Sequence, residues 1–322
     1  MTQAATSSRP AILTVAKLPS FLMEPLNEAF VVHDRLHETD PAAFEKVAPQ
    51  IRGVCGGGES KVPRALMDKL PALEVVSIMG VGYDGVDVPA AIERRVPVTH
   101  TPNVLNDEVA DLAIGLMLSV ARRIPQADRY VREGRWASEG PMPLARKMSG
   151  ARLGIVGLGR IGQAIATRAQ AFGMSIAYTG RNARAELPFT YYPTAQALAA
   201  QVDFLVAITP GGAGTKHLIN ADVLKALGPK GYLINVARGS VVDEAALIQA
   251  LQQGVIAGAG LDVFEKEPQV PEALRALDNV VLTPHMASAT WQTRQAMADL
   301  AVENLKAHFA GRPLLSPVPE CS

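Results

Sequence analysis

The chain has 322 residues, 48% of them hydrophobic, and its 31 basic side chains balance its 31 acidic ones. This length supports a large core and two domains of about 100–200 residues each. A formal net charge of zero provides no overall field to attract nucleic acid or an anionic membrane. We therefore expect no nucleic-acid partner.

Two features of the sequence bear on the cellular compartment. Cys55 and Cys321, the two cysteines, have neither metal-ligand nor C-x-x-C spacing, so we expect no disulfide framework and no metal site. The segment MTQAATSSRP at 1–10 has no basic region followed by an apolar core, and no apolar run approaches the roughly 20 residues of a membrane span. We expect a cytoplasmic protein without a membrane partner.

Short apolar, β-branched runs alternate with helical patterns from residue 10 to residue 285, which predicts a mainly parallel α/β architecture. In the first third, strands are expected at 11–16, 30–36, 52–57, 74–80 and 96–101, with helical patterns at 62–70 and 88–95 between them. From 106 to 123, apolar residues recur at helical spacing behind Asn106, a residue typical of helix N-caps. This long helix is expected to connect two domains.

A second α/β series follows this helix. Its strands are expected at 152–157, 175–180, 202–209, 231–237, 257–264 and 279–284, and a helical segment follows each of the first four. The tail from Thr290 to Phe309 predicts one more helix, which we expect to pack on the first domain. The best linker candidate is 136–150, because its glycines and prolines resist regular structure.

A glycine motif opens the second series. Gly157, Gly159 and Gly162 have G-x-G-x-x-G spacing and stand between an apolar strand and a helical pattern. At such a turn the first glycine permits the bend, the second lets backbone amides approach a pyrophosphate, and the third lets the helix pack on the strand. The context favours dinucleotide binding over the alternative, a glycine-rich turn that binds nothing.

The end of the next strand, about 20 residues further on, distinguishes NAD from NADP. NAD sites have an acid there that accepts a hydrogen bond from the ribose 2′-hydroxyl. Here the strand leads into Arg181, Asn182 and Arg184, and the first carboxylate is Glu186. A guanidinium can bind a 2′-phosphate through two hydrogen bonds. We expect NADP(H), with NAD(H) as the weaker alternative, although solvated loop arginines would give the same pattern.

Three ionisable residues follow expected strands, where open α/β sheets bind ligands. They are Arg238, Glu267 and His285. A lone histidine at a strand end is more often structural. Here a histidine that can transfer a proton is accompanied by a carboxylate that can orient it and an arginine that can hold a substrate carboxylate. The combination favours a catalytic site.

Segments over nearly the whole chain resemble the D-isomer-specific 2-hydroxyacid dehydrogenases. The segments are MGVGYDGVD from 79, TPNVLNDEVADLAIGLML from 101, VGLGRIG from 156, NVARGSVVDEAAL from 235, GLDVFEKEP from 260 and NVVLTPHMASAT from 279. The resemblance implies two Rossmann-like α/β domains, each a parallel sheet flanked by helices, with an active-site cleft between them. We expect a discontinuous substrate-binding domain at 1–101 and 287–322 and an NADP-binding Rossmann domain at 102–286.

The resemblance also implies roles for individual residues. His285 would be the acid/base, Glu267 its carboxylate partner and Arg238 the anchor for the substrate's carboxylate and carbonyl. The backbone amides at Val81 and Gly82 would bind the substrate carboxylate. The motif and the resemblance together give a cofactor-binding set of Gly157, Leu158, Gly159, Arg160, Ile161, Gly162, Arg181, Asn182, Arg184, Thr209, Pro210, Thr215, Val236, Ala237 and Asp262. Within this set, the resemblance places Asp262 at the nicotinamide end and Thr209, Pro210 and Thr215 on the adenosine side.

Within the family, the arginine-containing loop resembles the NADP-preferring glyoxylate/hydroxypyruvate reductases. One departure is ITPGGAGT at 208–215, where many relatives have a segment like PLT, so adenine-side contacts do not carry over directly. Trp136 lies in a region that in some reductases closes over the substrate, sometimes from the partner subunit; ordinary packing is the alternative. Glu267 argues against a formate dehydrogenase, and the 37 residues after His285 are too few for the regulatory domain of larger phosphoglycerate dehydrogenases.

The expected function is therefore NADPH-dependent reduction of small 2-oxoacids, such as glyoxylate and hydroxypyruvate, with His285 as the proton donor. The D configuration of the product is implied by the resemblance alone. We expect a homodimer. The alternatives are a dinucleotide-sensing corepressor of the same fold or another D-2-hydroxyacid dehydrogenase with a larger substrate. A methyltransferase would explain the glycine motif but not Arg181 or the three ionisable residues.

Overall fold

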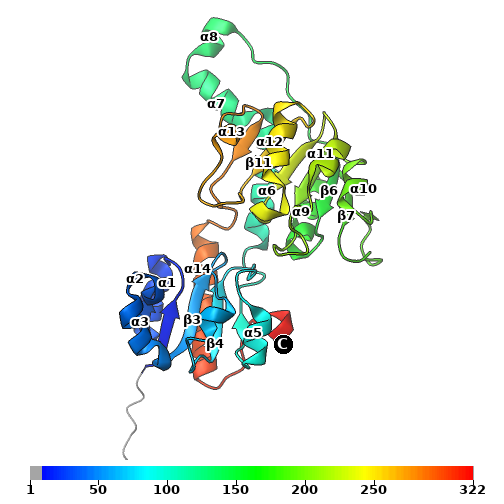
Figure 1. Cartoon of the computed structure of the whole chain (residues 1–322). Helices are drawn as coiled ribbons and strands as arrows, with labels where there is room; N and C mark the ends of the chain where they lie inside the picture. The colour runs from blue at the N-terminus through cyan, green and yellow to red at the C-terminus, as the bar shows by residue number, and fades with distance from the viewer. Residues whose placement is uncertain (1–8, 322) are drawn as a thin grey trace, which may run out of the picture. The chain divides into compact units, whose positions relative to one another are not determined.

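A computed structural model describes residues 9–321, which form two compact units (Figure 1). Unit 1 comprises the described residues up to Leu105 and from Thr290 onward, and unit 2 comprises Asn106–Ala289. The segment at 1–10, in which we expect no targeting signal, lies mostly outside the described residues. Within residues 9–321, no helix has both the length and the apolar character needed to cross a membrane.

Unit 1 is built on a five-stranded parallel sheet with the strand order β2-β1-β3-β4-β5. Its strands are β1 (Ala11–Thr14), β2 (Val31–Asp34), β3 (Ile51–Gly57), β4 (Val75–Met79) and β5 (Val98–Thr99). Its helices are α1 (Ser20–Ala29), α2 (Leu36–Thr39), α3 (Pro41–Val47), α4 (Arg64–Met67), α5 (Val88–Glu93) and α14 (Trp291–Phe309), with 3-10 turns η1 (Ala48–Gln50) and η3 (Pro319–Cys321). Every residue of β4 is buried, as expected for an inner strand of a parallel sheet covered on both faces.

The C-terminal helix α14 packs against β4 and α1 in unit 1, as its apolar pattern predicts. Its N-cap is Thr290, whose side chain accepts a hydrogen bond from the Thr293 N–H. Ser77 on β4 donates its hydroxyl to the carbonyl of Ala301 at 2.9 Å, which fixes the helix on the sheet.

Unit 2 contains a seven-stranded parallel sheet with the order β12-β11-β10-β9-β6-β7-β8. Its strands are β6 (Arg152–Val156), β7 (Ser175–Thr179), β8 (Thr190–Tyr191), β9 (Phe204–Ala207), β10 (Tyr232–Asn235), β11 (Gly258–Leu261) and β12 (Val280–Leu282). Its helices are α6 (Asn106–Arg122), α7 (Ile124–Arg132), α8 (Arg135–Glu139), α9 (Arg160–Ala171), α10 (Ala195–Ala199), α11 (Ala221–Leu227), α12 (Glu244–Gln252) and α13 (Glu272–Arg275), with the 3-10 turn η2 (Gly239–Val241). The sheet reverses its order at β6, which pairs with β7 on one side and β9 on the other.

The observed strands confirm the predicted parallel α/β architecture and correct some details. Each expected strand coincides with an observed one, but most end earlier; 257–264, for example, reduces to Gly258–Leu261. The difference arises because the chain leaves the sheet at these carboxyl ends to form loops. Strand β8 was not expected, since it has two residues and lies between Pro188 and Pro193.

The expected linker at 136–150 is wrong in its first part. Residues Arg135–Glu139 form helix α8, where Arg135 Nε donates to Glu139 Oε1 at 2.8 Å across one helical turn. The chain then has no regular structure from Gly140 until β6. Helices α7 and α8 have no buried residues, and α8 stands clear of the unit 2 sheet in Figure 1. Helix α7 lies next to the start of β12, where the Gln126 side chain donates to the Asp278 carbonyl at 2.6 Å.

Candidate active site

The glycine motif forms the turn between β6 and α9. Gly157 has a φ of +101°, and a Cβ there would lie 2.8 Å from the carbonyl oxygen of Ile208. A Cβ at Gly162 would lie 2.4 Å from the Gly157 oxygen, so both positions require glycine. A Cβ on Gly159 would have no atom within 4 Å, so there is open space here at the N-terminus of the 12-residue helix α9. This turn, at the point where the strand order reverses, fits a dinucleotide pyrophosphate.

The two arginines that follow β7 differ in their surroundings. Arg184 donates from Nη1 to the Leu158 carbonyl at 2.9 Å and from Nε to Glu186 at 2.7 Å. Its guanidinium therefore connects its own loop to the glycine turn. Arg181 and Asn182 are exposed, so Arg181 is the better-placed candidate for a 2′-phosphate.

The segment predicted to border the adenosine follows β9 directly. Thr209 lies against the glycine turn, since its Cα is 3.0 Å from the position of a Cβ on Gly157. Thr215 donates its hydroxyl to the Pro210 carbonyl at 2.7 Å and so closes the ITPGGAGT turn. The segment at 208–215, which departs from the family pattern, therefore forms an ordered turn beside the glycine motif.

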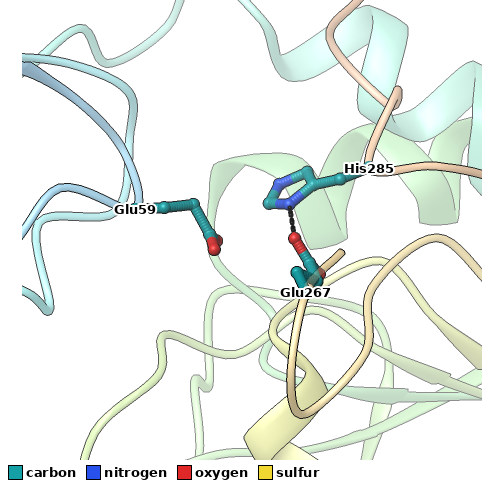
Figure 2. Close-up of side chains that lie close together, drawn as sticks. All are labelled: Glu59, Glu267 and His285. Atoms are coloured by element: carbon teal, nitrogen blue, oxygen red, sulfur yellow. Dashed lines mark hydrogen bonds and ion pairs between the residues drawn. The ribbon is translucent and has the colours of Figure 1, made fainter. Parts of the chain in front are cut away.

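His285 and Glu267 form a hydrogen-bonded pair (Figure 2). His285 Nδ1 lies 2.7 Å from Glu267 Oε2, and Glu267 Oε1 accepts the Phe264 N–H at 2.9 Å. An ionised carboxylate only accepts, so Nδ1 carries the proton of this bond. Burial by itself would raise the pKa of Glu267, but the bonds from His285 and Phe264, with the charges of His285 and Arg238, hold it below its usual value.

Asp262 anchors the loop that carries His285. This buried carboxylate, only 1% exposed, accepts from the Met286 N–H at 2.8 Å, the Ala287 N–H at 2.9 Å and the Thr283 hydroxyl at 2.6 Å. Its own backbone carbonyl accepts the His285 N–H at 2.8 Å. These bonds hold His285 at a φ of +47°, a left-handed conformation unusual for histidine. The contact of Asp262 with a nicotinamide stays a prediction, and its anchoring role was missed because nothing in the sequence spacing reveals it.

Arg238 follows β10, and its loop lies directly on the loop that leads to Glu267. Arg238 Nη1 donates to the Ala237 carbonyl at 2.8 Å, and the Asn235 side chain donates to the Arg238 carbonyl at 3.0 Å. A Cβ on Gly239 would come within 1.9 Å of the Phe264 carbonyl carbon, so the two backbones are in contact. Val236 and Ala237, two further predicted cofactor residues, are buried at the start of this loop.

A second histidine–glutamate pair lies in unit 2 and was also missed. His217 Nε2 lies 2.6 Å from Glu265 Oε1, and His217 Nδ1 lies 3.9 Å from Asp243 Oδ2. The His217 N–H donates to the Ser240 carbonyl at 2.8 Å. His217 does not follow a strand, which is why sequence reasoning gave it no role.

The loop that is predicted to bind the substrate's carboxylate belongs to unit 1. Val81 and Gly82 come shortly after β4, behind Gly80. A Cβ on Gly80 would lie 2.7 Å from the Gly58 Cα, so the start of this loop packs closely on a neighbouring glycine.

Comparisons with known proteins identify the family. A family model described as "D-isomer specific 2-hydroxyacid dehydrogenase, NAD binding domain" matches residues 114–287. The chain is 48% identical to hydroxyphenylpyruvate reductase of Plectranthus scutellarioides, over 95% of this chain and 98% of the relative. It is 46% identical to 2-ketogluconate reductase of Gluconobacter oxydans, over 97% and 99% respectively.

A solved structure is similar over nearly the whole chain. It is the NADPH-dependent glyoxylate/hydroxypyruvate reductase of Sinorhizobium meliloti in complex with NADP and malonate, with 53% identity, a TM-score of 0.92 and 98% of both chains covered. The expected resemblance is therefore confirmed by both sequence and fold. The chain belongs to the D-isomer specific 2-hydroxyacid dehydrogenase family and is an enzyme of that family.

Proposed function

We propose that the protein reduces small 2-oxoacids, glyoxylate and hydroxypyruvate among them, to 2-hydroxyacids with NADPH. The observation that carries this proposal is the His285–Glu267 pair, with the charge of Arg238 acting on Glu267, in a unit that also has a dinucleotide-type glycine turn. The names of the three similar reductases support it, because their named substrates all have a carbonyl beside a carboxylate.

The proposed chemistry assigns one task to each side chain. NADPH, when bound, supplies the hydride that adds to the substrate's carbonyl carbon. His285 gives a proton from Nε2 to the carbonyl oxygen, while Glu267 holds the ring and stabilises its charged form. Arg238 binds the substrate's carboxylate and also faces the carbonyl oxygen that His285 protonates. Negative charge grows on that oxygen during addition, so His285 and Arg238 stabilise the transition state more than the bound ketone.

The preference for NADPH is proposed to come from Arg181. Its exposed guanidinium follows β7, whereas that of Arg184 is engaged by Leu158 and Glu186. If Arg181 binds the 2′-phosphate, Arg181→Ala raises the KM for NADPH about 10- to 150-fold, as expected for loss of a charge-assisted hydrogen bond. The KM for NADH is the internal control and stays within about twofold, because NADH has no 2′-phosphate.

A steady-state substrate panel tests the whole proposal. Glyoxylate, hydroxypyruvate, hydroxyphenylpyruvate and 2-ketogluconate are each compared with NADPH and with NADH. The proposal expects the highest kcat/KM for a small 2-oxoacid with NADPH. Preference for NADH in the wild type, or no turnover of any 2-oxoacid, would refute it.

We also propose that the enzyme is a homodimer formed through the α7–α8 arm and that it acts in the cytoplasm. Four large apolar side chains of the arm and the following loop are exposed, namely Ile124, Val131, Trp136 and Leu144. Cys55 is a buried free thiol, which suits a reducing compartment. Light scattering should give twice the 34.1 kDa chain mass, and Val131→Lys should shift the protein toward monomer. A wild-type monomer would contradict the dimer.

A further inference from the structure

The peptide bond between Val81 and Gly82 in unit 1 is held by a buried histidine. His100 Nδ1 lies 2.9 Å from the Val81 carbonyl oxygen, and His100 is 8% exposed. A carbonyl oxygen only accepts, so Nδ1–H is the donor, and it can donate in the neutral and in the protonated ring. In a trans peptide the carbonyl and the next N–H point in opposite directions. Fixing the Val81 carbonyl therefore fixes the direction of the Gly82 amide.

His100 is itself held on several sides. The backbone N–H of His100 donates to the Ser316 carbonyl at 3.1 Å, and the backbone carbonyl of His100 accepts a hydrogen bond from the Ser316 hydroxyl at 2.6 Å. The ring of Tyr83 meets the imidazole edge-on, with centroids 5.2 Å apart and an interplanar angle of 86°. The Tyr83 hydroxyl in turn donates to Glu320 at 2.9 Å. The imidazole is therefore preorganised before any substrate binds.

The loop on which His100 acts is also restrained. The Gly80 N–H donates to the Ile78 carbonyl at 3.0 Å, and the Gly80 carbonyl accepts the Thr101 N–H at 2.8 Å. Gly80 is thus fixed on one side of Val81, and the ring of His100 fixes the Val81 carbonyl. A backbone amide with a fixed direction is an effective donor to an anion, because binding then orders little additional structure.

We propose that His100 is a positioning residue that aims the Gly82 amide at the carboxylate of the 2-oxoacid. This inference rests on the proposed function, in which the Val81–Gly82 loop binds that carboxylate. His100 acts through the Val81 carbonyl and does not take part in proton transfer. Its effect therefore falls on substrate binding and leaves the chemical step to His285.

Two substitutions with opposite expectations test the inference. His100→Leu keeps apolar bulk but has no donor, and it raises the KM for glyoxylate and hydroxypyruvate about 5- to 30-fold. Its kcat and its KM for NADPH stay within about twofold of wild type, because neither depends on the Gly82 amide. His100→Asn places an amide N–H close to the former Nδ1 position and restores the KM to within about threefold of wild type.

A binding measurement separates positioning from general damage. Oxamate, a non-reacting analogue with the same carboxylate, should have an inhibition constant that rises in His100→Leu in parallel with the KM. If His100→Leu does not fold, His100→Gln takes its place; its amide lies one methylene further out, so it should raise the KM while His100→Asn does not. Equal losses of kcat and NADPH binding, or no rescue by asparagine, would overturn the positioning role.

The outcome also distinguishes this inference from the proposed function. A wild-type enzyme that reduces 2-oxoacids, with an unchanged KM in His100→Leu, overturns the inference alone. A wild-type enzyme that neither turns over 2-oxoacids nor binds oxamate overturns both.

Discussion

Unit 2 contains two histidine–glutamate pairs that are alike in local geometry. The His285–Glu267 distance is 2.7 Å and the His217–Glu265 distance is 2.6 Å, and the two glutamates are separated by one residue. Both histidines have positive φ angles, +47° and +51°. Hydrogen-bond length and backbone conformation therefore do not distinguish His285, the proposed catalytic histidine, from His217.

The two pairs differ in what surrounds them. Glu267 is the less exposed glutamate, its second oxygen accepts the Phe264 N–H, and the charge of Arg238 acts on it. His285 stands just beyond β12, where open parallel sheets bind ligands. His217 instead ties its own turn to Ser240 through its backbone. The comparison teaches that position at a strand end and a convergent positive charge distinguish the pair proposed to be catalytic.

The largest expected effect is on the histidines themselves. His285→Ala removes the proposed proton donor, so kcat for 2-oxoacid reduction is expected to fall about 10²- to 10⁴-fold while NADPH binding, followed by fluorescence titration, is retained. The matched variant His217→Ala removes only a partly exposed pair and changes kcat by less than about fivefold. Comparable losses in the two variants would break the distinction between the pairs.

Substitution of the glutamates is expected to have a smaller effect on the rate, together with a shift of the pH profile in a defined direction. In Glu267→Gln the geometry survives but the negative charge is lost, so the imidazolium of His285 is less stable and the proton-donor form disappears at a lower pH. The basic limb of the kcat/KM profile for 2-oxoacid reduction therefore moves to lower pH, and the rate at its optimum falls about tenfold.

Glu265→Gln is the control for this profile, since it changes the same residue type two positions away. Its basic limb should coincide with that of the wild type. The catalytic assignment of Glu267 fails if the limb of Glu267→Gln stays in place, or moves to higher pH.

The smallest effect is on stability in acid. The folded state holds the pKa of Glu267 below its usual value, so this group contributes stability at pH values above the ordinary carboxyl range, and the contribution is lost as the pH falls through the folded pKa. The stability difference between wild type and Glu267→Gln should thus shrink by about 1 kcal/mol or less on going from about pH 7 to about pH 3. Urea unfolding across this range measures it, and a constant difference would show that Glu267 is not held ionised by folding.

Much of the fold could be predicted because its signals are local in the sequence. Apolar runs give the strands, and the spacing of Gly157, Gly159 and Gly162 gives the turn before α9. Strand β8 could not be predicted because it has two residues and depends on its pairing with β7. Helix α8 escaped prediction because the prolines and glycines that follow it dominate the local pattern.

The candidate site was predictable in its residue types and less so in its partners. The sequence places His285 and Glu267 after strands, and the structure brings them into hydrogen-bonding contact. The sequence cannot show which of the two loop arginines already has hydrogen-bond partners, because one partner of Arg184 is the Leu158 carbonyl, 26 residues earlier in the chain. The anchoring role of Asp262 likewise depends on contacts that only the folded loop creates.

The close approach of Gly239 to the Phe264 backbone has a consequence for how this enzyme can be altered. The loop that carries Arg238 and the loop that carries Glu267 touch main chain to main chain, so neither can shift without moving the other. A change of backbone made to fit a bulkier substrate around Arg238 would also displace the partner of His285. Directed evolution toward new 2-oxoacids should consequently leave 238–240 and 264–267 unchanged and accumulate its useful substitutions in other loops.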